Sequence, residues 1–271
     1  MNNESRMDQN ISPIGALALR TNILGVGISV INMDDALKLS DTLIHSQDRH
    51  YVCVTDVHTV IEAQSDADFR AILNKSSMTT PDGMPLVWVA KIQGHQNVRR
   101  VYGPDFLLEM CRVSMQSGYR HFFFGGGPGI ADRLSEELKE KFPGLNVVGT
   151  YTPPFRPLTS SEETELLQIV AQVKPDVFWV GLGSPKQERF MAKYCGKLDA
   201  KLMVGVGAAF DIHSGTVKEA PRWLKMAGLQ WLHRLLQEPR RLWKRYLICI
   251  PSFMWKISLQ LLGVRRFPVE A

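Results

Sequence analysis

The sequence predicts an α/β fold in which a mainly parallel β-sheet is covered by helices. Three observations indicate this class. Short runs of apolar residues alternate with longer stretches of helical periodicity. The runs are apolar at consecutive positions, as in strands that are buried on both faces of a parallel sheet. Several of them end in glycine, where a tight turn leads into the next segment.

The same alternation can be followed from one end of the chain to the other. The expected strands are Ile23–Ile31, Tyr51–Thr55, His121–Gly125, Asn146–Tyr151, Val177–Gly181 and Leu202–Gly207. The expected helices are Asp34–His45, Phe69–Lys75, Pro104–Ser117, Ile130–Phe142, Ser161–Val173 and Pro185–Cys195. Asn32 can cap the first helix, and Ser160 with Glu163 has the spacing of a capping box. This order of elements predicts a Rossmann-like core.

The pattern changes after Asp211. Two basic, tryptophan-rich helices are expected at Ala220–Leu236 and Arg240–Leu262, with Pro239 and Pro251 as breaks or kinks. The last 54 residues hold 11 Lys and Arg against 3 Asp and Glu, so they carry +8 while the first 217 residues carry −3. A basic segment on a neutral-to-acidic body indicates an anionic partner.

The partner of this basic segment is expected to be a membrane surface. Leu247–Val264 is long enough to approach a bilayer span, but Pro251 and Lys256 interrupt it, so a spanning helix is disfavoured. An interfacial helix with Trp243 and Trp255 at headgroup level fits better. The alternative is an ordinary amphipathic helix packed on the core.

The chain is therefore expected to have three parts: residues 1–20 as a flexible tail, 21–215 as the α/β catalytic core, and 216–271 as a basic α-helical, membrane-associating appendage. The composition is that of a globular protein, with 45% hydrophobic and 22% charged residues. The four cysteines form no CxxC pair, which predicts a reduced, cytoplasmic protein without structural zinc. The first 19 residues lack the pattern of a signal peptide.

Three strand-end glycine turns indicate a ligand site but not a dinucleotide site. The turns begin at Gly125, Gly181 and Gly205, and such turns before a helix suit phosphate groups. A dinucleotide fingerprint needs a third small residue at positions that Ile130, Lys186 and Phe210 occupy here. An NAD-dependent oxidoreductase is therefore disfavoured, and the absence of a GxxxxGK[ST] motif disfavours an ordinary ATPase or kinase.

Asp66-Ala67-Asp68 has the DxD spacing of a metal-bound diphosphate site, but it directly precedes the helical stretch Phe69–Lys75. Acidic residues at a helix start are explained by capping, so no metal is expected.

Four polar clusters interrupt apolar surroundings at the expected strand ends. They are Thr55-Asp56-Val57-His58, Thr80-Pro81-Asp82-Gly83, the run from Gly183 to Glu188, and Phe210-Asp211. The carboxyl ends of parallel strands meet at one edge of a sheet, so these clusters are expected to converge. For any one cluster alone, helix capping explains the residues as well as catalysis does.

Sequence motifs in these regions resemble those of the WecG/TagA/CpsF glycosyltransferases. The motifs are TPDGMPLVW, RVYGPD, FFFGGGPG, GLGSPKQE, GVGAAFD and the basic segment from APRWLK to KRYL, in the family's order, and the similarity extends from about Leu24 to Tyr246. The resemblance implies an inverting, metal-independent enzyme. It would transfer N-acetylmannosamine, its uronic acid or another hexose from UDP to a polyprenyl-diphosphate-linked sugar in bacterial surface polysaccharide synthesis.

The resemblance also implies roles for individual residues. Asp82 would be the general base, and Arg234 and Arg241, with Lys244, would close over the site and stabilise the departing diphosphate. The implied substrate-binding residues are Asp56, His58, Thr80, Gly83, Arg100, Gly103, Asp105, Gly125, Gly126, Gly183, Pro185, Lys186, Gln187, Glu188, Gly207, Phe210, Asp211 and Lys244. Two residues depart from the family pattern: Asp56 replaces the usual Asn, and Gln230 the usual Glu. Asp56 would place a second carboxylate near Asp82, which raises the pKa of a neighbouring acid.

The expected partners are thus a UDP-sugar donor, a polyprenyl-diphosphate-linked acceptor and an anionic membrane, with no cofactor. The expected location is the cytoplasmic face of the bacterial inner membrane, as a peripheral protein. Monomer and homo-oligomer both remain open. Two other classes were weighed: a nucleotide-binding oxidoreductase with a degenerate site, and a nucleic-acid-binding protein. The second is disfavoured because bulky apolar residues interleave the cations.

Overall fold

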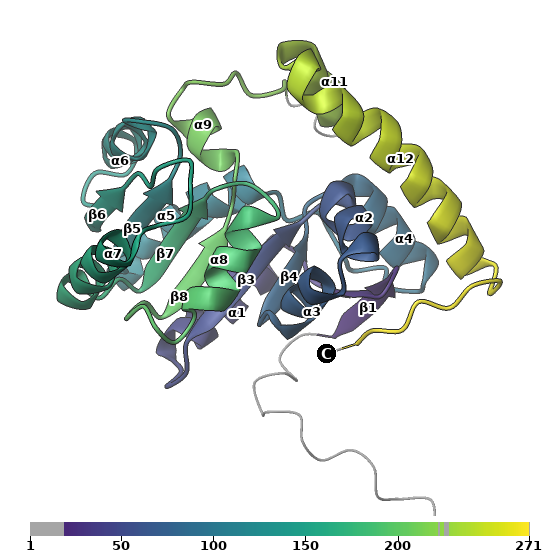
Figure 1. The fold of residues 1–271 in the computed structure, drawn as a ribbon, viewed down its shortest axis with the longest axis horizontal. Coiled ribbons are helices and arrows are strands. Elements are labelled where there is room, and N and C mark those ends of the chain that lie inside the picture. Colours follow the sequence, from purple (N-terminus) through teal and green to yellow (C-terminus); the bar gives the residue numbers. More distant parts are fainter. Residues whose placement is uncertain (1–18, 222, 225–227, 271) are drawn as a thin grey trace, which may run out of the picture.

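The computed structural model describes residues 19–221, 223–224 and 228–270, and the side chains of 230, 241, 242, 244 and 245 lie outside the described part. A central sheet has six parallel strands in the order β4-β3-β8-β7-β5-β6. The strands are β3 (His50–Thr55), β4 (Met78–Pro81), β5 (His121–Gly125), β6 (Val147–Tyr151), β7 (Val177–Gly181) and β8 (Leu202–Gly205). Helices flank this sheet (Figure 1), which confirms the predicted α/β class.

One or two helices follow each strand of the central sheet along the chain. The helices of the core are α1 (Met33–His45), α2 (Val57–Ser65), α3 (Ala67–Lys75), α4 (Met84–Ile92), α5 (Gly103–Ser117), α6 (Ile130–Lys141), α7 (Ser160–Val173), α8 (Lys186–Tyr194) and α9 (Ala209–His213). Asn32 caps α1 as predicted. The capping box of α7 is formed by Thr159 and Glu162, one residue earlier than predicted, because Thr159 keeps an extended backbone while Ser160 is already helical.

The hydrophobic core has two halves, one on each face of the sheet. Along β5, Phe123 belongs to the half that contains α1, α5 and α6, whereas Phe122 and Phe124 belong to the half that contains α2, α3 and α8. Trp179 and Phe178 alternate in the same way on β7. Side chains alternate between the faces of a strand, so a run of apolar residues serves both halves. This explains why the central strands could be predicted from the sequence.

The expected strand Ile23–Ile31 is wrong. The chain forms an antiparallel hairpin of β1 (Arg20–Ile23) and β2 (Val26–Ser29), separate from the central sheet. Leu24 and Gly25 form its two-residue turn, with φ of 53° and 79°. Two consecutive positive φ values are typical of a type I′ hairpin turn. Leucine rarely takes the first of these positions, so residues 24 and 25 do not have the pattern of such a turn.

The last two helices are α11 (Gln230–Gln237) and α12 (Pro239–Leu261). Pro239 occupies the first turn of α12, whereas Pro251 lies inside it without ending it. α12 packs along α2, and the chain then turns back beneath the fold toward β1 (Figure 1). There the Leu24 amide donates to Gln260 Oε1 at 2.8 Å, and Asn22 Nδ2 donates to the Phe267 carbonyl at 2.7 Å. Among the described residues, no helix has both the length and the apolar character needed to cross a bilayer.

Candidate active site

The carboxyl ends of β3 and β4 bring two of the predicted polar clusters together. The Asp82 amide donates to the Thr55 carbonyl at 2.9 Å, which ties the residue after β4 to the end of β3. Gly83 lies against the start of α2, because a Cβ on it would be 3.9 Å from Asp56 Cα. Asp56 caps α2 by accepting hydrogen bonds from the amide and the hydroxyl of Thr59, each at 2.9 Å. The two acidic residues thus lie at adjacent strand ends.

Arg100 holds Asp82 in place. Its Nη2 lies 3.2 Å from Asp82 Oδ1, and its Nε donates to the Asp82 carbonyl. The guanidinium also stacks over the Tyr102 ring, 4.2 Å from the centroid. Both ion-pair partners are largely shielded, with side-chain exposures of 19% and 21%. A charged pair with additional hydrogen bonds in a shielded place has a fixed geometry.

The environment of Asp82 makes it a stronger base than an ordinary aspartate. The pKa of Asp82 is raised from 3.8 to about 6, chiefly by burial, and the Asp56 carboxylate contributes to the rise. The positive charges of Arg100 and of Arg234, which comes from α11, act in the opposite direction. Most Asp82 side chains are therefore ionised at neutral pH, while their proton affinity is close to that required for general-base catalysis.

The loop after β7 and the start of α8 form the second side of the site. Gln187 and Glu188 are buried at the start of α8, and Gln187 Nε2 donates to Glu188 Oε1 at 3.0 Å. The pKa of Glu188 is raised to about 7, chiefly by burial, and Asp56 contributes to the rise. Thr59 Oγ1 donates to Ser184 Oγ at 3.3 Å and so connects this loop to α2.

Two buried oxygens in this part of the site, Gln187 Oε1 and Glu188 Oε2, have no hydrogen-bond partner among the described groups. A Cβ on Gly207 would lie 3.3 Å from that Gln187 oxygen, so the turn after β8 reaches the same place. Buried polar groups normally have hydrogen-bond partners. These two oxygens are therefore atoms to which a ligand can donate hydrogen bonds.

The glycine turns depend on close contact between neighbouring strand ends. The Gly126 amide donates to the Gly181 carbonyl at 3.0 Å, and a Cβ on Gly125 would lie 2.6 Å from the Gly181 carbonyl carbon. The Phe210 ring fills the space beside Gly181, where a Cβ would be 2.6 Å from the ring. Only glycine fits such contacts.

Apart from Gly125, Gln187, Glu188 and Arg234, the predicted site residues fall into three groups in the structure. Those at or near the sheet edge and partly exposed are Asp56, His58, Asp82, Gly83, Arg100, Asp105, Gly126, Gly183, Pro185, Gly207 and Asp211, with Lys186 exposed beside them. Thr80, Gly103 and Phe210 are completely or almost completely buried. The side chains of Arg241 and Lys244 lie outside the described part of the structure.

Arg234 reaches this site from a part of the chain about 150 residues further along. Its charge acts on both Asp82 and Tyr102, whose pKa values it lowers. Its Nε is buried without a hydrogen-bond partner among the described groups, and its Nη2 lies 3.6 Å from Oε2 of Glu238, the residue that follows α11. Tyr102 and Thr59 were not singled out from the sequence, although Tyr102 belongs to the RVYGPD motif. Ser184 was included only as part of the run from Gly183 to Glu188.

Asp66 has a structural role, as predicted. It caps α3, since Oδ1 accepts from the Phe69 amide at 2.9 Å, and its other oxygen pairs with Arg189.

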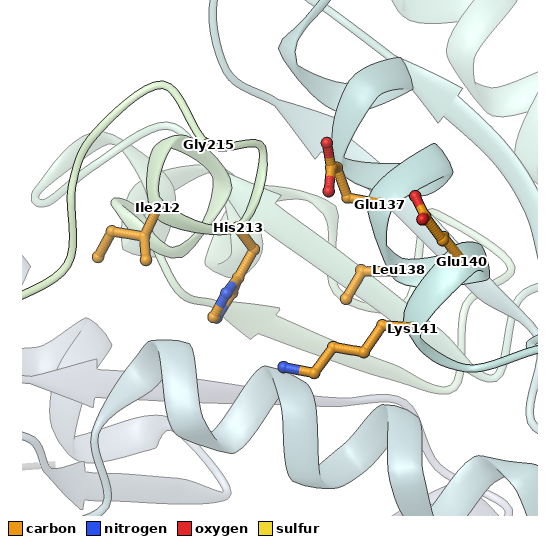
Figure 2. A pocket seen from close by; sticks show the side chains of 7 residues that line it. All are labelled: Glu137, Leu138, Glu140, Lys141, Ile212, His213 and Gly215. Carbon is orange, nitrogen blue, oxygen red and sulfur yellow. The ribbon is translucent and has the colours of Figure 1, made fainter.

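A cavity of about 550 Å³ lies elsewhere, between α6 and α9 (Figure 2). Figure 2 shows Glu137 and Lys141 of α6 on one side and Ile212 and His213 of α9 on the other. His213 Nε2 lies 2.9 Å from the Pro104 carbonyl oxygen, and burial lowers the pKa of this imidazole. None of the predicted site residues lines the cavity, so we do not assign the reaction to it.

A shielded carboxylate paired with Arg100, on which the charge of Arg234 also acts, thus lies at the carboxyl edge of the parallel sheet and is suited to general-base catalysis. Comparison with known proteins identifies the class. The chain belongs to the WecG/TagA/CpsF family of glycosyl transferases, whose family model matches residues 21–267. The resemblance noted in the motifs is thereby confirmed, and the oxidoreductase alternative is set aside.

Two curated relatives share this family. The chain is 29% identical over 216 residues to the N-acetylglucosaminyldiphosphoundecaprenol N-acetyl-beta-D-mannosaminyltransferase of Bacillus spizizenii, covering 80% of this chain and 81% of the relative. It is 28% identical over 191 residues to the enzyme of the same name from Bacillus subtilis strain 168, covering 70% of this chain and 72% of the relative.

Proposed function

We propose that this glycosyltransferase moves a hexose from a UDP-sugar to a polyprenyl-diphosphate-linked saccharide, with inversion at the anomeric carbon, in bacterial surface polysaccharide synthesis. The hexose is N-acetylmannosamine, its uronic acid or glucose. Family membership and the names of the two relatives support the acceptor and the type of sugar. The observation that carries the proposal is Asp82, held by Arg100 beside the glycine turns with a raised pKa.

In the proposed mechanism, Asp82 removes the proton from the acceptor hydroxyl as its oxygen attacks the anomeric carbon. A positioned base contributes about 10²–10⁴-fold to a rate. Arg100 fixes the direction of the carboxylate, since it bonds both the side chain and the carbonyl of Asp82. The acceptor oxygen forms the new glycosidic bond, the bond to UDP breaks, and the proton remains on Asp82 until solvent removes it.

The UDP leaving group gains negative charge as its bond breaks. Arg234, together with Arg241 and Lys244, is proposed to offset this charge without a metal ion, because guanidinium groups bind phosphate oxygens in a bidentate way. The buried Nε of Arg234 supports this role, since it is available to a phosphate oxygen. The DxD motif is not needed as a metal site, because Asp66 is engaged as a cap and with Arg189.

The donor is proposed to bind along the glycine turns. Gln187 and Glu188 offer oxygen atoms that a ligand can satisfy, and Asp211 is proposed to contact the nucleoside. Asp56 raises the pKa of both Asp82 and Glu188, so the replacement of the family's usual Asn changes the proton affinity of both carboxyls. We propose that this replacement contributes to the choice of sugar.

The protein is proposed to work peripherally at the cytoplasmic face of the inner membrane, held there by residues 216–271. The outer surface of α11 and α12 supports this, because Leu236, Leu247 and Trp255 are 75%, 61% and 69% exposed. Exposed arginines, Arg240 and Arg265 among them, accompany these apolar side chains. An apolar face with cations at its border is typical of an interfacial helix.

The test is a UDP-release assay with a panel of UDP-sugars and a synthetic polyprenyl-diphosphate N-acetylglucosamine. Wild-type protein should release UDP with one donor and only in the presence of acceptor. Asp82→Asn should lower kcat by about 10²–10⁴-fold while UDP still binds, with binding measured by calorimetry. Normal turnover by Asp82→Asn would remove this residue from the mechanism, and no release with any donor would contradict the proposed function.

A further inference from the structure

Helix α4 starts beside Asp82 and carries apolar side chains on its exposed side. Met84, Trp88 and Ile92 are spaced four residues apart and so lie along one face of the helix. We call these three residues the α4 face. Trp88 is 50% exposed and Ile92 is 68% exposed, while Leu86, Val87, Val89 and Ala90 on the other sides are buried. A helix that is apolar all round is usually buried, so its exposed face indicates a partner.

The charge around the α4 face fits an anionic partner. Between Met84 and Gly103 the sequence contains no Asp or Glu, whereas Lys91 and Arg99 provide positive charge at the far end of the helix and beyond it. Arg99 is exposed and Lys91 is half-buried. A protein partner chosen for apolar contact alone would not require a segment free of acids. Anionic lipid headgroups above a hydrocarbon layer match both properties.

The α4 face also continues into the segment before α11. A Cβ on Gly228 would lie 3.4 Å from Met84 Cβ and 3.6 Å from the Trp88 ring, so the two segments are in contact. Leu229, the next residue, is 37% exposed, and Trp223 in the same segment is 66% exposed. The apolar surface therefore extends from the catalytic body to the basic helices that are proposed to lie on the membrane.

We infer that the α4 face docks on the anionic membrane surface and brings Asp82 to the bilayer. This inference rests on the proposed function in one respect. A lipid-linked acceptor sugar is separated from the bilayer only by a diphosphate, so its hydroxyl reaches Asp82 only if the surface around Asp82 lies near the lipid. Helix α4 leads from that residue for about 12 Å, at 1.5 Å per residue, along an apolar, acid-free face. The catalytic body thus has its own membrane contact, distinct from α11 and α12.

The inference can be tested by co-sedimentation of the full-length protein with phospholipid vesicles. Trp88→Ser combined with Ile92→Ser should lower the partition coefficient onto phosphatidylcholine vesicles with about one third phosphatidylglycerol by about tenfold. The matched control is Phe155→Ser. Phe155 is 86% exposed and follows β6, at the opposite edge of the sheet from β4. This control should bind the vesicles as wild type does.

Ile92→Glu provides a second variant, since the position is exposed and the negative charge of glutamate would be repelled by an anionic membrane. It should also bind more weakly, and Phe155→Glu is its control. Wild-type binding by both α4 variants would overturn the inference. Size-exclusion chromatography without vesicles tests the alternative that a second copy of the chain covers the α4 face. The inference would also be overturned if wild type ran as a dimer and Trp88→Ser combined with Ile92→Ser ran as a monomer. Failure of the proposed function would appear instead as no UDP release by wild type, with the vesicle difference still present.

Discussion

The destabilisation caused by burying the ionised Glu188 carboxylate can be measured directly. The side chain is 0% exposed, and burial raises its pKa from 4.5 to about 7. An acid with a higher pKa in the folded state binds its proton more tightly there than in the unfolded state. Rising pH therefore destabilises the fold, beginning near 4.5 and reaching the full effect above about 7. Glutamine at this position cannot titrate, so Glu188→Gln removes the contribution of this residue to the pH dependence of stability.

The size of the effect follows from the two pKa values. One pKa unit corresponds to about 1.4 kcal/mol, so the ionised Glu188 side chain costs about 3 kcal/mol at pH 8 and about 1 kcal/mol at pH 5. The free energy of unfolding of Glu188→Gln minus that of wild type should therefore be about 2 kcal/mol larger at pH 8 than at pH 5. If the new amide forms fewer hydrogen bonds, the free energy of unfolding of the variant falls by the same amount at each pH. The change between pH 5 and pH 8 is then unaffected.

The assay is urea unfolding followed by tryptophan fluorescence at pH 5, 6, 7 and 8. Glu140→Gln on the exposed side of α6 controls for the removal of one negative charge. A stability difference between Glu188→Gln and wild type that stays constant across the range would refute the argument. It would mean that the Glu188 carboxylate is as well solvated in the folded protein as in the unfolded chain.

Three further outcomes are expected. In the wild type, kcat/KM should fall about tenfold per pH unit below pH 6, because protonation of Asp82, with a pKa of about 6, removes the base; a flat profile from pH 5 to 8 would contradict this. Arg234→Met should lower kcat by about 10²-fold in steady-state UDP release, because a charge that stabilises the leaving group is lost; an effect on KM alone would assign it to binding. Gly181→Ala should lower the free energy of unfolding by about 1–3 kcal/mol, because its Cβ would lie 2.6 Å from the Phe210 ring, and an unchanged Tm would show that the ring can move.

The central sheet could be predicted because its strands are marked by residues that only a doubly covered strand tolerates. β5 and β7 match their predicted bounds, since HFFFG and VFWVG are apolar on both faces and end in glycine. β4 was not predicted. Its four residues, MTTP, include two threonines and a proline, and they are buried only because β3 and the β1–β2 hairpin lie beside them.

The residues of the site can likewise be divided into those that could be predicted from the sequence and those that could not. Asp56, Asp82 and the start of α8 could be placed at one sheet edge, because parallel strands in a covered sheet all end on the same side. The ion pair between Arg100 and Asp82 could not be derived from spacing, since it depends on the path of the chain after α4. The position of Arg234 depends on how α11 packs, which no local pattern specifies. Tertiary contacts, rather than propensities, determine these details.

The attachment of the chain's last described segment to the β1–β2 hairpin affects the order of folding. Asn22 and Phe267 are joined across 245 residues, and Asn74 bonds the Glu270 carbonyl across 196. During synthesis the hairpin emerges before the central sheet, but the residues that bond to its turn are made only after the entire sheet. Contacts with such sequence separation form slowly. The contacts of the hairpin are thus completed only after the last described residues have been made, although the hairpin itself is made before the sheet.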